Sequence, residues 1–294
     1  MKAKNLLPFL ILSALLCSCG GKPQAVAPEG FRADITLKTT PVKDRGASPV
    51  GWCCAMLDVI ETEHLMQGDS VNLSSDYVMR CWLRQQTQEY MRSNGSSDIT
   101  ATAIAPTVTV LLRRYGCFPY DSYSNPRPVN YGVLVRRLKM LADVAMARGD
   151  TEEECMKSID SLLDKEIGFL PKHVYMLRAE YTPLEFAHSV CGKDEYVTLM
   201  PSERTDCAGT VMSSDSIYAY ICRSLEDRHP VLWAGDTSAD GAVAIIGTGH
   251  DRNGDAYFVA KGTRADSGKQ GDRLYIKASL VQRYTAYAVV KRDI

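Results

Sequence analysis

The sequence predicts an α+β fold in which a helical half precedes a small antiparallel sheet. Up to about residue 225, apolar residues recur with helical spacing in several segments. From about residue 228, short β-like apolar runs such as "PVLWAG" and "GAVAIIGTG" take over, and Asn253-Gly254 supplies a hairpin signal. Helices first and strands last are typical of the α+β class.

The chain of 294 residues is long enough for one large domain or two small ones, and its 45% hydrophobic residues permit a sizeable packed core. We expect a signal peptide over 1–18, a tether and lead-in over 19–44, and a main domain over 45–294. Within this domain the helical half spans about 45–225 and the sheet half about 228–294.

Charge and motifs argue against several classes of function. The formal net charge of -1 provides no basic field for nucleic acid. No GxGxxG, Walker or zinc-ribbon pattern occurs, so nothing supports a nucleotide or a structural zinc ion. The sequence therefore predicts no cofactor, no metal and no nucleic-acid partner.

The N-terminus resembles the leader of a bacterial lipoprotein. Two lysines precede an apolar run over residues 6–16, which is too short to span a bilayer and fits a secretory h-region. The next residues, "LCSCGGK", resemble a lipobox, with Leu16 three positions before Cys19 and Ser18 directly before it. The resemblance implies acylation of Cys19 and a lipid-anchored protein of the cell envelope, periplasmic or on the outer-membrane surface. A soluble secreted protein cut nearby is the alternative.

Helical spacing predicts helices over residues 52–67, 72–89, 106–115, 131–167, a short stretch from 182, and 214–225. Ser48-Pro49 provides an expected N-cap and first helical position for the first of these, and Ser74 opens the second. Gly116 ends the third, and Gly149-Asp150 breaks the long region into two helices. Further strands are expected at "DAYFVAKG", "RLYIKAS" and "YAVVKRD".

Eight cysteines follow the lipobox, namely Cys53, Cys54, Cys81, Cys117, Cys155, Cys191, Cys207 and Cys222. Outside the cytoplasm they can oxidise, and an even count permits full pairing, although the connectivity stays open. Adjacent Cys53 and Cys54 point in different directions on a helix and should not bridge each other.

The order of these features resembles the papain-like cysteine peptidases, most closely the bleomycin hydrolase/aminopeptidase C branch, which carries helical insertions between its halves. A glycine-bearing loop feeds a helix that begins with Trp52, followed by "VIETEHL", "NLSSDYVMRC" and, much later, "GAVAIIGTG", "YFVAKG" and "LYI". The resemblance covers roughly residues 40–294 and is strongest over 45–81 and 228–277. It implies a papain-like fold with a helical insertion between the helical half and the sheet half.

The resemblance also implies where the catalytic positions of the family fall. Gly46, Trp52, Glu61 and the segment 73–81 match the first half of the family pattern in one register. In that register the glutamine of the oxyanion hole is Arg45 and the nucleophilic cysteine is Gly51. In the second half, Gly241 takes the position of the histidine, Lys261 that of a lysine, Gly262 that of the asparagine and Arg264 that of a tryptophan.

These replacements predict a catalytically inactive homologue, a pseudoenzyme. The family chemistry needs a thiolate at a helix N-terminus, a histidine to move the proton, and an asparagine to orient the imidazole ring. A glutamine side chain donates to the oxyanion. Glycine can perform none of these roles.

A relocated nucleophile is the fallback, and Cys53 is its first candidate. A shift of two residues turns a side chain by about 200° around the helix, so the thiol would face away from the partner strand. The available bases are unpromising: His250 lies at a hairpin turn, His229 before a strand, and His64, His173 and His188 on stretches predicted to be helical. Cys53 and Cys54 are instead expected to be core residues or disulfide partners. The resemblance implies a disulfide at Cys81.

Three functions follow as hypotheses. The first is a membrane-anchored, inactive papain-like protein that binds a peptide or protein ligand in the former active-site groove. The second is an active cysteine aminopeptidase that uses a relocated thiol such as Cys53. The third is a structural subunit of an envelope complex. The sequence does not discriminate the first from the third.

Overall fold

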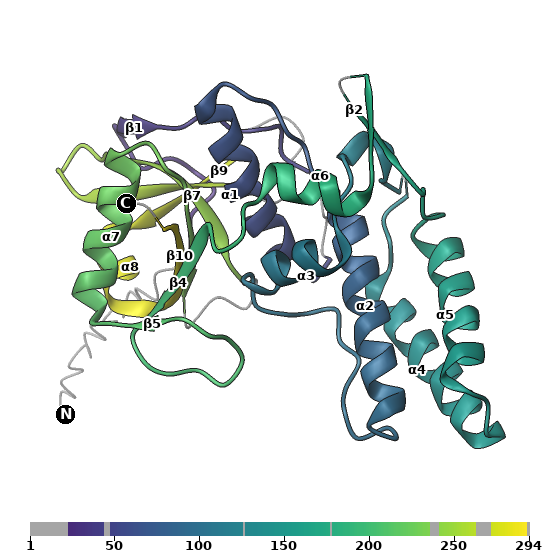
Figure 1. Ribbon diagram of the computed structural model, residues 1–294. Coiled ribbons are helices and arrows are strands. Elements are labelled where there is room, and N and C mark those ends of the chain that lie inside the picture. The colour runs from purple at the N-terminus through teal and green to yellow at the C-terminus, as the bar shows by residue number, and fades with distance from the viewer. Residues whose placement is uncertain are drawn as a thin grey trace, which may run out of the picture.

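The computed structural model describes residues 23–43, 48–125, 127–176, 178–235, 241–262 and 272–292. Two lobes lie side by side, with a bundle of helices on one side, a twisted sheet on the other and helix α1 between them (Figure 1). The fold class predicted from the sequence, α+β with an antiparallel sheet after helices, is confirmed.

The helices are α1 (Gly51–Gln67), α2 (Ser75–Arg92), α3 (Thr107–Tyr115), α4 (Tyr131–Arg148), α5 (Glu152–Glu166), α6 (Pro183–Val190), α7 (Ser214–Glu226) and α8 (Ala278–Tyr284), with a 3₁₀ turn at Tyr120–Ser122. Ser74 caps α2 by accepting a hydrogen bond from the Tyr77 N–H, as its residue type predicts. The cap expected at Ser48-Pro49 is wrong, because Val50 precedes α1 and no side chain caps it.

The strands are β1 (Arg32–Thr36), β2 (Val174–Met176), β3 (Ala179–Tyr181), β4 (Tyr196–Met200), β5 (Thr210–Val211), β6 (Val231–Gly235), β7 (Val243–His250), β8 (Ala256–Lys261), β9 (Arg273–Lys277) and β10 (Thr285–Lys291). The large sheet has the order β5-β4-β10-β6-β7-β8-β9, and β1 pairs with β7 beyond the end of β6. β2 and β3 form a separate hairpin.

Three strands of the large sheet come from outside the expected sheet half. β1 lies in the segment expected to be a tether and lead-in, and its residues pair with the last part of β7. β4 and β5 lie in the expected helical half, and β4 pairs antiparallel with β10. The lead-in also pairs with β9, since the backbones of Gln24 and Tyr275 exchange two hydrogen bonds.

Alternate residues of the sheet pack into different cores. Leu232 and Ala234 of β6 join the cluster built on α1, whereas Val231 and Trp233 join the cluster with α7 and α8. This alternation follows from the two-residue period of a strand. α1 is buried along most of its length because it packs against β6 and β7 on one side and α2 and α3 on the other.

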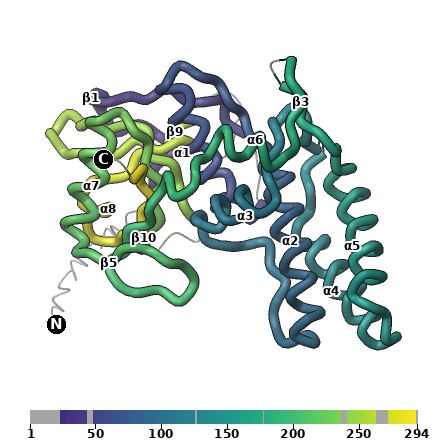
Figure 2. The backbone as a smooth tube through the Cα atoms, in the orientation of Figure 1, coloured from purple at the N-terminus to yellow at the C-terminus, as the bar shows by residue number. Residues whose placement is uncertain are grey.

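The expected helical insertion is a pair of long helices followed by a hairpin. α4 and α5 run side by side (Figure 2), separated by Gly149 in the left-handed conformation and the capping box of Thr151 and Glu154. The β2–β3 hairpin projects from the top of this lobe (Figure 1). None of the helices within the described ranges is both long and apolar enough to cross a membrane.

Candidate functional site

The structure brings Gly241 against the first turn of α1. Gly51 is the first residue of this helix and is buried. Gly241 lies just before β7 with a φ of +86°, and a Cβ built on it would be 3.6 Å from the backbone nitrogen of Trp52. The two glycines that the sequence resemblance predicted at the positions of the nucleophile and the histidine therefore lie on facing elements, at the junction of α1 and β7.

The other aligned positions are only partly within the described structure. Gly262 follows β8 directly, and its N–H donates a hydrogen bond of 2.8 Å to the carbonyl of Asp272. Arg45, Gly46, Arg264 and the lipidation candidate Cys19 lie outside the described residues.

The fallback nucleophile, Cys53, has no access to solvent. Its side chain is fully buried, and its sulfur lies 4.0 Å from the carbonyl oxygen of Ser75. Burial raises the pKa of its thiol well above the ordinary value, and the neighbouring Cys54 adds to this effect. A buried thiol with a raised pKa is a poor nucleophile because little thiolate forms.

Each histidine is engaged elsewhere or exposed. His64 contacts Asp69 and the carbonyl of Val190 through its two ring nitrogens, at 3.0 and 2.9 Å. His250 pairs with Asp34, His173 with Glu180 and His229 with Glu63, while His188 is exposed on α6. The helical assignment of His173 is wrong, since it precedes β2. Within the described part of the chain, no imidazole ring contacts Cys53.

The cysteines pack as small core residues. Cys53, Cys81, Cys117, Cys155 and Cys191 are buried free thiols. The disulfide that the resemblance implied at Cys81 is therefore wrong, and burial raises the pKa of this thiol to about 12. Cys207 and Cys222 are free and partly exposed.

A buried polar network links β8 to α1. The Lys261 ammonium donates to Asp58 Oδ1 at 2.5 Å and to Thr40 Oγ1 at 2.8 Å, although only 1% of its side chain is exposed. The Thr40 hydroxyl in turn donates to Glu61, which also accepts from Lys43 and from the Leu73 N–H. The network thus joins the lead-in, α1 and β8.

Desolvation dominates the electrostatics of this network. Burial raises the pKa of Asp58 to about 6, although the nearby charge of Lys261 opposes the shift. The family resemblance singled out Glu61 and Lys261 in the sequence, but Asp58 and Thr40 were missed. The spacing of Asp58 and Glu61 places both carboxylates on one face of α1, which is the signal that could have found the pair.

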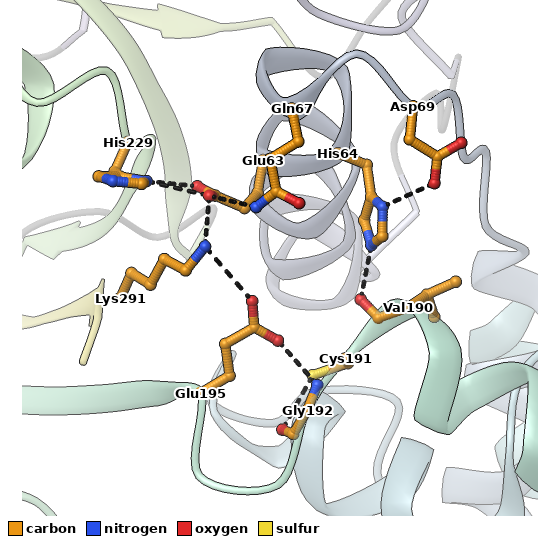
Figure 3. A network of polar contacts seen from close by, with 10 residues as sticks. All are labelled: Glu63, His64, Gln67, Asp69, Val190, Cys191, Gly192, Glu195, His229 and Lys291. Atoms are coloured by element: carbon orange, nitrogen blue, oxygen red, sulfur yellow. Dashed lines mark hydrogen bonds and ion pairs between the residues drawn. The ribbon is translucent and has the colours of Figure 1, made fainter. Parts of the chain in front are cut away.

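A second network ties α1 to the C-terminal strand (Figure 3). The buried carboxylate of Glu63 accepts from the Lys291 ammonium at 2.6 Å, from His229 Nδ1 at 2.9 Å and from the Gln67 amide at 2.9 Å. Burial alone would raise the pKa of Glu63, but the hydrogen bonds from Lys291 and His229 outweigh it, and the pKa is lowered. This network was missed because its members are far apart in the sequence.

Two cavities of the described structure lie elsewhere. One of about 50 Å³ is lined by Arg113, Cys191, Glu195 and their neighbours, and a shallow hollow of about 650 Å³ lies on α5. Neither is lined by Gly51 or Gly241. Over the described ranges, no group of three or more His, Cys, Asp and Glu side chains could hold a metal ion.

Comparison with known proteins bears on the fold alone. No protein-family model matches the chain, and no curated protein matches it in sequence. Among solved structures, PepW from Lactobacillus rhamnosis HN001 is similar, with a TM-score of 0.68 and 13% identity over 91% of this chain and 83% of PepW.

More distant matches include two further structures. Procathepsin L 3 from the larval midgut of Tenebrio molitor has a TM-score of 0.46 and 13% identity, covering 92% of this chain and 75% of its own. The bromelain protease of Ananas comosus, solved with the E64 inhibitor, has a TM-score of 0.45 and 12% identity, covering 86% and 93%. The similarity to PepW supports one statement: this chain has the papain-like α+β fold.

Proposed function

We propose that this chain is a membrane-anchored, catalytically inactive relative of the papain-like cysteine peptidases that binds a peptide or protein segment at the junction of α1 and β7. One observation supports the proposal: Gly51 and Gly241, which the resemblance assigns to the thiol and imidazole positions of the family, lie on facing elements. A scaffold that keeps the junction but lacks these side chains can hold a chain segment without cleaving it.

The surroundings of Cys53 argue against the relocated nucleophile. The thiol is buried, its pKa is raised, and no described imidazole is in contact to remove its proton. A nucleophilic thiol needs the opposite environment, with access to substrate and a neighbouring base or positive charge.

The proposed anchor is the acyl group on Cys19 that the lipobox implies. The first described contacts of the chain follow soon after this residue, where Gln24 pairs with Tyr275 of β9. Five residues of extended chain span about 17 Å, so an acylated Cys19 would keep the sheet lobe close to the envelope membrane. We expect mass spectrometry of the native protein to find the acyl group on Cys19.

A labelling experiment tests the absence of peptidase chemistry. The reduced chain is incubated with the epoxysuccinyl inhibitor E64, with bromelain as positive control, and every cysteine peptide is examined by mass spectrometry. We expect labelling of bromelain and none of this chain. Stoichiometric labelling of one cysteine, lost when that cysteine is changed to alanine, would overturn the proposal and favour an active peptidase.

A matched pair of variants tests the binding site. Asparagine tolerates a positive φ better than other side chains, so Gly241→Asn adds bulk beside Trp52 with little backbone strain. Gly149→Asn adds the same side chain at a φ of +74° with nothing within 4 Å. We expect the immobilised chain to retain peptides from an envelope-protein digest, Gly241→Asn to lose most of this retention, and Gly149→Asn to keep it. Equal retention by both variants would place binding elsewhere.

A further inference from the structure

An exposed apolar and basic tip lies at one end of the helical lobe. It is formed by the last turn of α5, the segment that follows, and the β2–β3 hairpin, which projects from the body near α6 (Figure 1). We define this hairpin tip by six residues: Lys165, Phe169, Leu170, Lys172, Tyr175 and Arg178.

The apolar members of the hairpin tip are unusually exposed. Phe169 is 81% exposed, Tyr175 70% and Leu170 49%, and the three lie within seven consecutive residues. The Tyr175 hydroxyl donates a hydrogen bond to Glu180, and the tyrosine side chain remains largely exposed on the hairpin. Single exposed apolar residues are common on soluble proteins, but a cluster of large ones marks a contact surface.

The charges around these side chains are unbalanced. Lys165, Lys172 and Arg178 are exposed, and none of them forms an ion pair with any residue that the structure describes. Among the neighbouring carboxylates, Glu166 pairs with Arg137, while Glu180 contacts His173 at 3.0 Å, which is an ion pair only when the imidazole is protonated. The three cations thus outnumber the one nearby carboxylate that no lysine or arginine pairs with. The hairpin tip therefore presents uncompensated positive charge beside its apolar side chains.

A hollow adjoins the hairpin tip. It measures about 650 Å³, and Lys165, Phe169 and Ser161 are among its lining residues. The two acidic residues that line it, Asp160 and Asp164, are paired with arginines of α2. Of its remaining polar side chains, Lys157 pairs with Glu153, whereas Lys165 and Ser161 can donate to an anionic group.

We propose that the hairpin tip docks on an anionic lipid surface, with Phe169, Leu170 and Tyr175 entering the interface and the three cations contacting headgroups. Aromatic side chains with flanking lysines and arginines are the combination that binds membrane interfaces. A projecting tip suits a lipid surface, whereas a stable protein partner needs roughly 800 Å² of complementary surface on each side. This contact is independent of the acyl group on Cys19 and would orient the anchored protein with its helical insertion on the membrane.

Vesicle co-sedimentation tests the proposal with the chain from Gly20 onward, which keeps every described residue and carries no acyl group. Vesicles contain phosphatidylcholine alone or with about 30 mol% phosphatidylglycerol. One variant removes the charges (Lys165→Gln, Lys172→Gln and Arg178→Gln) and another the apolar contacts (Phe169→Ser and Tyr175→Ser). Matched controls change exposed residues elsewhere: Arg136→Gln, Arg148→Gln and Lys193→Gln, and Met140→Ser with Val144→Ser.

We expect binding to anionic vesicles to exceed binding to neutral ones by roughly 100-fold, because each cation near the surface contributes about a factor of five. Both tip variants should lose most of the binding, salt should weaken that of the wild type, and the controls should bind normally. Tip variants that bind as well as the wild type, or equal binding to both kinds of vesicle, would overturn the proposal. A dimer would also overturn it: if sedimentation equilibrium finds a dimer of the wild type that the variant with Phe169→Ser and Tyr175→Ser does not form, the tip contacts a second copy.

The protein used in the vesicle test starts at Gly20 and carries no acyl group, so failure of that test leaves the proposed anchor at Cys19 untouched. Loss of peptide retention by Gly241→Asn likewise concerns the junction of α1 and β7 and not the hairpin tip. The two proposals therefore fail separately.

Discussion

The Lys261 ammonium lies 2.5 Å from a carboxylate oxygen of Asp58, and both side chains are buried. The pair joins the end of β8 to the middle of α1, and Lys261 directly precedes Gly262 in the chain. Burying two charges has a large desolvation penalty, which is offset here by the hydrogen bonds that Lys261 and Glu61 both make with Thr40. The network therefore fixes the two elements whose ends carry Gly51 and Gly262.

Removing the cation of this pair should be strongly destabilising. Lys261→Met keeps most of the volume but leaves Asp58 buried without a counter-charge, and we expect the free energy of unfolding to fall by about 3–5 kcal/mol. Urea denaturation at pH 7 measures the change. The control is Lys277→Met, which breaks a half-exposed pair with Asp255 and should change the stability by less than about 1 kcal/mol. Similar effects of both substitutions would contradict a dominant role for the buried pair.

The raised pKa of Asp58 predicts a specific pH dependence. Because its pKa rises from 3.8 to about 6 on folding, the folded protein binds a proton in this range that the unfolded chain has released. Its contribution to stability is thus fully present below about pH 4 and is lost as the pH rises through about 6. In urea denaturation from pH 4 to 7, the stability of the wild type relative to Asp58→Asn should fall by up to about 3 kcal/mol. A difference independent of pH would show that Asp58 does not titrate in this range.

Glu63 should show the opposite dependence. Its pKa is lowered, so its contribution is present above the unfolded value of 4.5 and is lost as the pH falls through the lower, folded value. Glu63→Gln leaves Lys291 and His229 without their shared carboxylate, and we expect a loss of about 3 kcal/mol at pH 7 that shrinks toward pH 3. Thermal or urea unfolding measures it. The control, Glu153→Gln, changes an exposed pair with Lys157 and should have little effect at any pH.

Thiol reactivity should follow burial. Cys207 and Cys222 are partly exposed, whereas Cys53, Cys81 and Cys191 are buried. We therefore expect iodoacetamide at pH 8 to modify Cys207 and Cys222 first in the native chain, and the buried thiols only on unfolding, as followed by peptide mass spectrometry. Rapid modification of native Cys53 would contradict its inert, buried state.

Much of the fold could be predicted because its signals are local. The caps at Ser74 and Thr182 and the break at Gly149 mark helix ends through contacts within a few residues. β1 and β4 escaped prediction because short strands depend on distant partners: β1 forms on β7 and β4 on β10, more than 80 residues away. α8 was not predicted: the expected strand "RLYIKAS" runs into its first two residues, and its seven residues carry little periodicity.

The candidate site also has residues that the sequence predicted and residues that it could not predict. Gly241 was singled out from the order of motifs, and the structure shows what that order could not, its approach to Trp52. The partners of Lys261 and Glu63 could not be predicted, because Thr40, His229 and Lys291 reach them from other elements. The disulfide at Cys81 was inferred from the resemblance alone, and the structure has this cysteine as a free thiol.

Gly241 also offers a test of the backbone at the junction. At its φ of +86°, any side chain other than asparagine or aspartate strains the backbone, so Gly241→Ala should lower the free energy of unfolding by about 1–2 kcal/mol. Gly241→Asn should lose less. Gly132→Ala lies at an exposed position of α4, where a new Cβ would meet only Asn130. It should instead stabilise the chain by about 0.5–1 kcal/mol, because alanine loses less entropy in a helix. Urea denaturation measures all three variants. If Gly241→Ala is as stable as the wild type, the positive φ of residue 241 does not strain a side chain, and the prediction is wrong.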